Sequence, residues 1–513
     1  MRTQNHVNEA TEAPVREVER SRTGVAGLDS ILRGGLPANR LYVIEGEPGS
    51  GKTTLAMQFL LEGIAKGETA LYVTLSETAD ELTQVAESHG WSLKGIHLLE
   101  LGALGERLGD GFDYTVFHPA DVELQETVKR VQAEVERLKP HRVVLDSVSE
   151  LKILAETNAR YRREILGVKQ FFAGRGCTVL ILDDRVNRDN DQQQQLQSIA
   201  HGVIRMNRDR REYGDTRRQV LIVKMRGVRF HDGMHDCNIR TGGLEVYPRL
   251  EVAGKQQPAD SNNAVLSGVP ELDVLLGGGL DHGTSALVIG PAGCGKTTLC
   301  SQYAMAALGR GEHVACFMFE ESRRTFLDRA SGMEMDFEPY LESGQLELNQ
   351  VDPSSFSPGE FAHRVCQSVE DKHATLVLID SLNGYLNAMP SERSLVIQMH
   401  ELLSYLGQKG VLTMLVMAQH GMLGPSMQTP IDVSFLADTV VLLRFFEASG
   451  EVRQAISVVK KRRTAHERTI REMRLTSTGV VVGEPLREFQ GVLTGVPRYR
   501  GTETPLLKKD GAN

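Results

Sequence analysis

Two stretches of this 513-residue sequence carry glycines and a lysine at a spacing that suits phosphate binding. They read GEPGSGKTT at 46–54 and GPAGCGKTT at 290–298, and both fit the pattern G-x-x-x-x-G-K-[ST]. In such a loop backbone N–H groups surround phosphate oxygens, the lysine reaches the β- and γ-phosphates, and the following threonine ligates Mg²⁺. The sequence therefore predicts two ATP-binding loops, formed by Gly46, Gly49, Ser50, Gly51, Lys52, Thr53 and Thr54 and by Gly290, Gly293, Cys294, Gly295, Lys296, Thr297 and Thr298.

Each loop needs an acid that shares the Mg²⁺ with its threonine. The apolar runs VVLDS and LVLIDS contain Asp146 and Asp380 at the point where a strand would end. A carboxylate there would lie beside the loop and hold the ion. We therefore predict that Thr53 and Asp146, and Thr297 and Asp380, are metal ligands. The alternative is that each aspartate only caps the helix that follows it.

Phosphoryl transfer also needs a group that positions or deprotonates the nucleophile. The strand after the first helix of each copy ends in polar residues, TLSET in one case and MFEES in the other. We predict catalytic roles for Glu77, Glu320 and Glu321, unless these are ordinary surface carboxylates. Because Ser76 stands where the second copy has Glu320, the two copies are expected to differ chemically.

The two loops belong to one long internal repeat. The stretch TGVAGLDSILRGGLP at 23–37 recurs as SGVPELDVLLGGGLD at 267–281, with Lys52 and Lys296 244 residues apart. The separation falls to 234 at Asp146 and Asp380, so the first copy holds an extra stretch near 101–117. An internal duplication explains these matches better than two chance motifs.

Within each copy β-branched runs alternate with amphipathic helical patterns, which is typical of a parallel α/β sheet covered by helices. We predict two tandem P-loop domains, each a mostly parallel sheet flanked by helices. The expected strands are RLYVIEG, TALYVTLSE, HRVVLDS, CTVLILDD and RQVLIVKMR, then SALVIG, HVACFMFEE, ATLVLIDS, VLTMLVMA and TVVLLRFF. The expected boundaries are a disordered arm at 1–20, domains at 21–250 and 265–490, a polar linker at 251–264 and a tail at 491–513.

Composition narrows the class of protein. The chain is 41% hydrophobic, has no apolar run long enough for a membrane helix, and begins without the apolar core of a secretory signal. A cytoplasmic protein is expected. The six cysteines form no C-x-x-C pair, which favours buried free thiols over a zinc site. The net charge of −9 argues against a nucleic-acid partner.

At the two glycine-rich loops and at several further motifs, the sequence resembles the KaiC family within the RecA-like ATPases. The resemblance covers roughly residues 21–495 and rests on the doubled loops and on GLDSILRGGLP, ELDVLLGGGLD, FEESRRTFL, IDSLN, ADTVVLLRFFE and ERTIRE. It implies that the two P-loop domains are tandem RecA-like domains. It also implies a double-ring homo-hexamer that binds ATP and Mg²⁺ between subunits, hydrolyses ATP slowly, and phosphorylates itself near the second site. Signalling partner proteins are implied as well.

The resemblance also implies roles for further residues. Lys224, Arg226, Lys460 and Arg462 look like residues that reach a neighbouring subunit's nucleotide, and the same K-x-R spacing occurs at matching places in both copies. Ser88 looks like a nucleotide-side residue. Glu320 and Glu321 match the family's paired acids. The family's phosphorylated Ser-Thr pair falls on Ser434-Phe435, so Ser434 is the expected phosphoacceptor and its neighbour has no hydroxyl.

Without the family, the K-x-R pairs could be solvated strand ends and Ser434 a turn residue. The function expected is an ATP-hydrolysing ring protein with serine autokinase activity in timing or signalling. Two alternatives stay open: a RecA-like DNA-binding ATPase, and an ATP-regulated scaffold without phosphoryl transfer. The stretches DRVNRDNDQQQQLQS at 184–198 and HGMLGPSMQTPID at 420–432, where DNA contacts would be expected, form no basic stripe.

Overall fold

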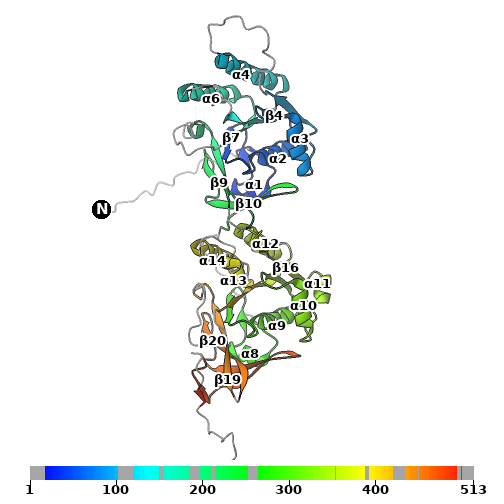
Figure 1. The fold of residues 1–513 in the computed structure, drawn as a ribbon, viewed down its shortest axis with the longest axis vertical. Coiled ribbons are helices and arrows are strands. Elements are labelled where there is room, and N and C mark those ends of the chain that lie inside the picture. Colours follow the sequence, from blue (N-terminus) through cyan, green and yellow to red (C-terminus); the bar gives the residue numbers. More distant parts are fainter. Residues whose placement is uncertain are drawn as a thin grey trace, which may run out of the picture. The chain divides into compact units, whose positions relative to one another are not determined.

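The computed structural model of the chain divides into two compact units, the first comprising residues up to Arg249 apart from 213–215, and the second beginning at Leu250 (Figure 1). The structure describes residues 18–101, 119–149, 155, 157–184, 196–210, 214–251, 264–352, 354–387, 392–419, 434–448, 450–493 and 498–499. Most of the predicted arm, the extra stretch of the first copy, the linker and the tail lies outside these ranges. The same holds for most of the two stretches considered for DNA contact.

The described residues of the first unit form one nine-stranded sheet. Its strand order is β11-β10-β9-β8-β3-β7-β6-β4-β5. Five neighbouring pairs, from β8 across to β5, are parallel, and β9, β10 and β11 add antiparallel strands at the other edge. The strands are β3 (Leu41–Gly46), β4 (Ala70–Thr74), β5 (Ile96–Glu100), β6 (Arg142–Asp146), β7 (Thr178–Asp184), β8 (Gly202–Asp209), β9 (Arg217–Met225), β10 (Met234–Arg240) and β11 (Gly243–Tyr247).

Helices cover both faces of this sheet because alternate strand residues point to opposite sides. On β4 and β6, Tyr72 and Val144 belong to the core cluster that includes the α2 side chains, whereas Val73 and Leu145 belong to the cluster on the other face with α4 and α6. The helices are α1 (Ala26–Ile31), α2 (Lys52–Ala65), α3 (Ala79–Ser88), α4 (Pro119–Leu138) and α6 (Asn158–Phe172).

The second unit repeats this plan. Its described residues form a nine-stranded sheet in the order β16-β15-β17-β18-β14-β19-β20-β21-β22. The strands are β14 (Ser285–Gly290), β15 (His313–Met318), β16 (Leu346–Gln350), β17 (Ala374–Asp380), β18 (Leu412–Ala418), β19 (Thr439–Ala448), β20 (Glu451–Lys461), β21 (Ile470–Thr476) and β22 (Gly479–Pro485). The helices are α8 (Pro270–Leu275), α9 (Lys296–Gly309), α10 (Arg323–Ser331), α11 (Glu338–Glu342), α12 (Pro358–Glu370), α13 (Leu382–Asn387) and α14 (Glu392–Gln408).

Three short antiparallel pairs complete the described strands, and two of them are repeat equivalents that precede the main sheets. These pairs are β1 (Arg20–Ser21) with β2 (Leu36–Pro37), β12 (Ala264–Val265) with β13 (Leu280–Asp281), and β23 (Phe489–Gln490) with β24 (Arg498–Tyr499). The first begins at the last residue of the predicted arm, and the second at the last residue of the predicted linker.

The predicted fold class is confirmed, and each expected apolar run contains a strand. The sequence did not reveal strand direction: RQVLIVKMR forms β9, which runs antiparallel to β8. It also missed β8 itself, since GVIRMNRD mixes apolar residues with arginines that lie half-buried on the sheet. β8 is the last strand of the parallel set, whereas β9, β10 and β11 follow as antiparallel strands, whose connections need no crossover helix.

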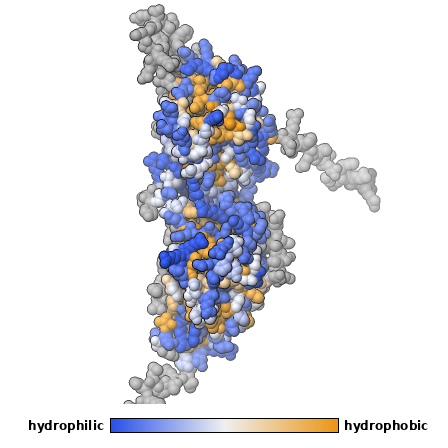
Figure 2. All heavy atoms as spheres, turned by 90° about the vertical axis from the view of Figure 1, so that its right-hand side faces the viewer, coloured by the Kyte–Doolittle hydropathy of each residue, from blue (hydrophilic) through white to orange (hydrophobic). Residues whose placement is uncertain are grey.

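Two general features of the described residues bear on the class of protein. None of their helices is long and apolar enough to cross a bilayer. On the face drawn in Figure 2, hydrophilic residues predominate, with hydrophobic ones showing between them.

All six cysteines lie in the described ranges and are buried free thiols, as predicted.

Candidate functional site

The two glycine-rich loops join the central strand of each sheet to a helix. β3 ends at Gly46 and α2 begins at Lys52, and β14 ends at Gly290 and α9 begins at Lys296. The residue before each lysine caps its helix in the left-handed region, with φ of 105° at Gly51 and 97° at Gly295, which favours glycine. The first backbone N–H groups of each helix are therefore directed toward the loop, where an anion binds.

In the first loop the lysine ammonium lies against its own backbone and one acid. Lys52 Nζ donates to the carbonyl oxygens of Gly46 at 2.9 Å and Glu47 at 3.0 Å. The same nitrogen lies 2.7 Å from Oδ1 of Asp184, at the end of β7. Sequence reasoning missed Asp184, because only the register that pairs Asp184 with Gly46 brings it to the loop.

The predicted metal ligands of the first site also meet. Thr53 Oγ1 donates to Asp146 Oδ2 at 3.4 Å, and the Tyr72 hydroxyl donates to the same oxygen at 2.5 Å. Burial raises the pKa of Asp146, and the hydrogen bond from Tyr72 partly opposes this change. Tyr72 is a second residue that the sequence did not reveal, since its contact depends on β4 lying beside β6.

In the second loop the lysine and the threonine make similar contacts, but the neighbouring residues differ. Lys296 Nζ donates to the Pro291 carbonyl at 2.7 Å, and Thr297 Oγ1 donates to Asp380 Oδ2 at 2.6 Å. The pKa of Asp380 is raised, mainly by burial, with Glu320 and Glu321 adding repulsion. A threonine hydroxyl beside a carboxylate is a hard oxygen donor set, so both sites fit Mg²⁺, which would neutralise phosphate charge when bound.

The paired acids of the second unit have separate partners. Ser381 Oγ donates to Glu320 Oε1 at 2.5 Å. Arg329 binds both carboxylate oxygens of Glu321, at 3.2 Å through Nε and 3.0 Å through Nη2, and its Nη1 donates to Thr298 at 3.3 Å. Glu320 therefore contacts the residue that follows Asp380, the predicted Mg²⁺ ligand, whereas Glu321 is held by Arg329 of α10. Arg329 was not singled out from the sequence.

In the first unit the corresponding acid is differently placed. Ser76 is exposed, and Glu77 is half-buried just before Thr78, which caps α3. Among the described residues Glu77 Oε2 is buried without a hydrogen-bond partner. Burial raises the pKa of Glu77, and the charges of Asp146, Glu81 and Asp184 raise it further. The structure brings Glu77 electrostatically close to the predicted Mg²⁺ ligand, but within the described ranges no cation pairs with Glu77 as Arg329 pairs with Glu321.

Ser88 is the last residue of α3, and its hydroxyl donates to the Val85 carbonyl at 2.7 Å. The neighbouring His89, which was not predicted, contacts the helix that follows the loop: its Nε2 is 3.5 Å from Thr54 Oγ1. Its Nδ1 is 3.0 Å from the Arg240 carbonyl, so one ring bridges the loop helix and β10.

The two K-x-R pairs occupy equivalent strand ends. Both strands bulge immediately before the lysine, at Val223 on β9 and Val459 on β20, where the registers shift. In the first unit Lys224 donates to the Gln197 carbonyl and Arg226 to the Ser198 carbonyl. A β-bulge changes the direction of the side chains that follow it, so the same local irregularity orients both K-x-R pairs.

Comparison with known proteins identifies an ATPase family, which is consistent with two phosphate-binding loops. A sequence model described as the KaiC ATPase matches residues 21–251 and 265–487. The chain belongs to the KaiC family of ATPases. The circadian clock oscillator protein KaiC of Thermostichus vulcanus is 28% identical over 500 residues, covering 96% of this chain and 94% of the relative. The protein of the same name from Synechococcus elongatus is 27% identical over 494 residues, covering 94% and 92%.

In this KaiC-family chain the predicted phosphoacceptor lies in a turn before β19. Ser434 is half-buried, and Phe435 beside it is 52% exposed. Lys460 Nζ donates to the Ser434 carbonyl at 2.8 Å, and Arg462 Nη2 donates to the Phe435 carbonyl at 2.7 Å. The second K-x-R pair therefore holds the two peptide groups that flank Phe435, directly after Ser434, as the first pair holds the carbonyls of residues 197 and 198.

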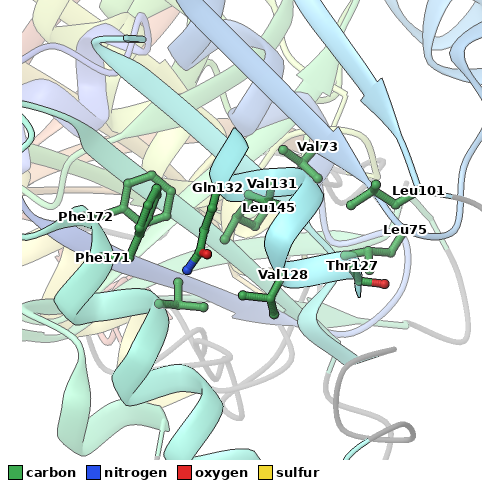
Figure 3. Close-up of a pocket in the computed structure, with 11 residues that line it drawn as sticks. Val73, Leu75, Leu101, Thr127, Val128, Val131, Gln132, Leu145, Phe171 and Phe172 are labelled. Atoms are coloured by element: carbon green, nitrogen blue, oxygen red, sulfur yellow. The ribbon is translucent and has the colours of Figure 1, made fainter. Parts of the chain in front are cut away.

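A separate small cavity of about 40 Å³ lies on the other face of the first sheet from α2. Figure 3 shows its side chains converging from α4, α6 and the ends of β4 and β6. The lining is almost wholly apolar, for example Val73, Leu145 and Phe172. Without a cluster of polar groups it has no means to orient a phosphate, and we assign the ATPase chemistry of this KaiC-family chain to the loops instead.

Proposed function

We propose that this chain is an ATP-hydrolysing ring protein with serine autokinase activity, acting in timing or signalling. The observation that carries the proposal is repeated in both units: the threonine after each P-loop lysine contacts the aspartate at the carboxyl end of a parallel strand, Thr53 with Asp146 and Thr297 with Asp380. The two relatives named above are clock oscillator proteins by name. Family membership supports the ATPase, and the timing role and the autokinase are the proposal.

The carboxylates of the two sites differ, and different roles for the two sites follow from this difference. In the second unit Glu320, bonded to Ser381, is available to position or deprotonate a nucleophile, with Glu321 fixed beside it. In the first unit Ser76 replaces the first acid. We therefore assign phosphoryl chemistry chiefly to the second site, and nucleotide-dependent assembly with weak turnover to the first.

A homo-hexamer in the cytoplasm is the proposed working form, with signalling proteins as partners. Arg462 is about half exposed, which leaves its guanidinium accessible to a neighbouring subunit. Several large apolar side chains of the second unit are also exposed, including Val452 and Val459 on β20. Such residues are typical of protein–protein contact surfaces where they adjoin one another.

Incubation of the full chain with γ-labelled ATP and Mg²⁺ tests the proposal. We expect both free labelled phosphate and label on the protein, and a shift to the hexamer mass by light scattering. Lys296→Ala should remove the protein label, whereas Lys52→Ala should impair assembly. ATP binding without either product would support the scaffold instead, and salt-sensitive binding of DNA would support the RecA-like alternative.

A further inference from the structure

The P-loop lysine of the first unit has a full set of hydrogen-bond partners within its own chain. An ammonium group has three N–H donors. Lys52 Nζ contacts two carbonyl oxygens, of Gly46 and Glu47, and the carboxylate of Asp184 at 2.7 Å. The lysine side chain is 8% exposed and that of Asp184 is 31% exposed, so the pair is only partly screened by water. A nucleotide oxygen must compete with these partners for the lysine.

The second unit has no acid at the equivalent place. β18 ends at Ala418, which is in register with Gly290 as Asp184 is with Gly46. The methyl group of Ala418 cannot pair with Lys296, whose ammonium donates to the Pro291 carbonyl. The two ATP sites therefore differ by one formal negative charge beside the lysine.

We propose that Asp184 is a specificity-determining residue of the first site, which lowers its preference for ATP over ADP. The lysine of such a loop reaches the β- and γ-phosphates, so Asp184 lies close to the position of the terminal phosphate. ATP places one more phosphate, and more negative charge, near this carboxylate than ADP does. Repulsion and competition for Lys52 consequently weaken ATP binding more than ADP binding.

Two neighbouring carboxylates strengthen this effect. Glu77 and Asp146 both interact electrostatically with Asp184, so the first site gathers three acids near one lysine. The second site also gathers three acids, Asp380, Glu320 and Glu321, but there Arg329 pairs with Glu321 and compensates its charge. The inference rests on the proposed function, because it requires nucleotide to bind at the first loop.

Equilibrium binding of ATP and ADP with Mg²⁺, measured by calorimetry, tests the inference in the full chain. Lys296→Ala would confine binding to the first site, and the Lys52→Ala/Lys296→Ala double variant gives the background. In the Lys296→Ala chain, Asp184→Asn and Asp184→Ala should raise the ratio of Kd for ADP to Kd for ATP by about threefold to tenfold. Asp184→Glu, which keeps the charge, should leave the ratio within about twofold.

The reciprocal change is the sharper experiment. In a Lys52→Ala chain, Ala418→Asp should lower the same ratio at the second site by about threefold to tenfold, and Ala418→Asn is the neutral control. A ratio unchanged in both Asp184→Asn and Asp184→Ala would overturn the inference. So would loss of all binding in Asp184→Asn with unchanged thermal unfolding, because Asp184 would then support the lysine rather than oppose ATP.

Failure of the proposed function gives a different result. In that case the folded wild-type chain, with both lysines present, would release no labelled phosphate and carry no label, even where it binds ATP. The affinities for ATP and ADP are measured without turnover, so they can still be compared in a chain that binds nucleotide but transfers no phosphate. A changed ratio can be measured only if the first site binds nucleotide, so the two failures are distinguishable.

Discussion

Arg329 and Glu321 form a two-point ion pair, in which the guanidinium binds both carboxylate oxygens at 3.2 and 3.0 Å. A third donor of the same guanidinium reaches Thr298 on the helix that begins at the P-loop. The pair thus ties α10 to α9 and fixes one of two adjacent acids. The other acid, Glu320, contacts Ser381 next to the predicted Mg²⁺ ligand.

This division of labour predicts unequal effects of amide substitutions on phosphate release. Glu320→Gln should lower the rate by about 10²–10⁴-fold, because it removes the carboxylate best placed to act on a nucleophile. Glu321→Gln should lower the rate of phosphate release less than Glu320→Gln does. Glu77→Gln should lower it least, since the first unit has Ser76 where the second has Glu320. Steady-state phosphate release from the three variants measures this order. A larger loss in Glu77→Gln than in Glu320→Gln would reverse the assignment of the sites.

The ion pair itself should stabilise the second unit. Arg329→Ala should lower the free energy of unfolding by about 1–2 kcal/mol in urea titrations, because charge-assisted bonds are lost from a partly buried pair. Arg324→Ala on the same helix is the matched control, since Arg324 is 91% exposed and should change stability by less than about 0.5 kcal/mol. Equal effects of the two variants would show that the pair contributes nothing.

Sequence patterns predicted the residues whose roles depend on local spacing. Lys52, Thr53 and their repeats follow from the glycine pattern, and Asp146 and Asp380 from strand ends, because one strand–loop–helix unit carries the whole loop. Asp184, Tyr72 and Arg329 could not be found in this way. The contacts of Asp184 and Tyr72 require the order of strands in the sheet, and that of Arg329 requires the orientation of α10.

The buried thiols predict resistance to alkylation. Burial raises the pKa of Cys316 and of Cys366 to about 12, from an ordinary value of 9.0. Since only the thiolate reacts, folded protein at pH 8 should take up almost no iodoacetamide by mass spectrometry, whereas urea-unfolded protein should be modified at all six cysteines. Raised thiol pKa values also mean that stability is intact below pH 9 and declines as pH rises toward 12. Rapid modification of native protein at pH 8 would contradict the buried assignment.

Action of Arg462 between subunits predicts complementation in mixed hexamers. Arg462→Ala should reduce turnover at the second site, because a cation that reaches a neighbour's phosphate acts like an arginine finger, with known effects up to about 10³–10⁵-fold. The loss should be smaller here if the reaction is slow. Hexamers mixed from Arg462→Ala and Lys296→Ala subunits should recover activity, since some interfaces then pair an intact loop with an intact arginine. No recovery in mixed hexamers verified by native mass spectrometry would place its action within one subunit.

The turn that contains Ser434, the predicted phosphoacceptor, is held by the second K-x-R pair. The Ser434 carbonyl accepts a hydrogen bond from Lys460, and the next carbonyl accepts one from Arg462. The two residues predicted to reach a neighbouring subunit's nucleotide therefore contact the turn that contains the serine. Phe435 stands where the family has a second hydroxyl, so one phosphate rather than two is expected. A serine hydroxyl needs a base and an in-line approach, and Glu320 of an adjacent subunit is our proposed base.

Incubation with ATP and Mg²⁺ should therefore place a single phosphate within 426–444, and peptide mapping by mass spectrometry should locate it on Ser434. Ser434→Ala should remove the modification while leaving phosphate release measurable, and Glu320→Gln should abolish it because the base is lost. Thr439 on β19 is the internal control, since it is 2% exposed and its hydroxyl should stay unmodified. Recovery of the wholly unmodified peptide while free phosphate accumulates would reject the autokinase and leave an ATPase switch. Phosphate on Thr429 would keep the autokinase but move its acceptor.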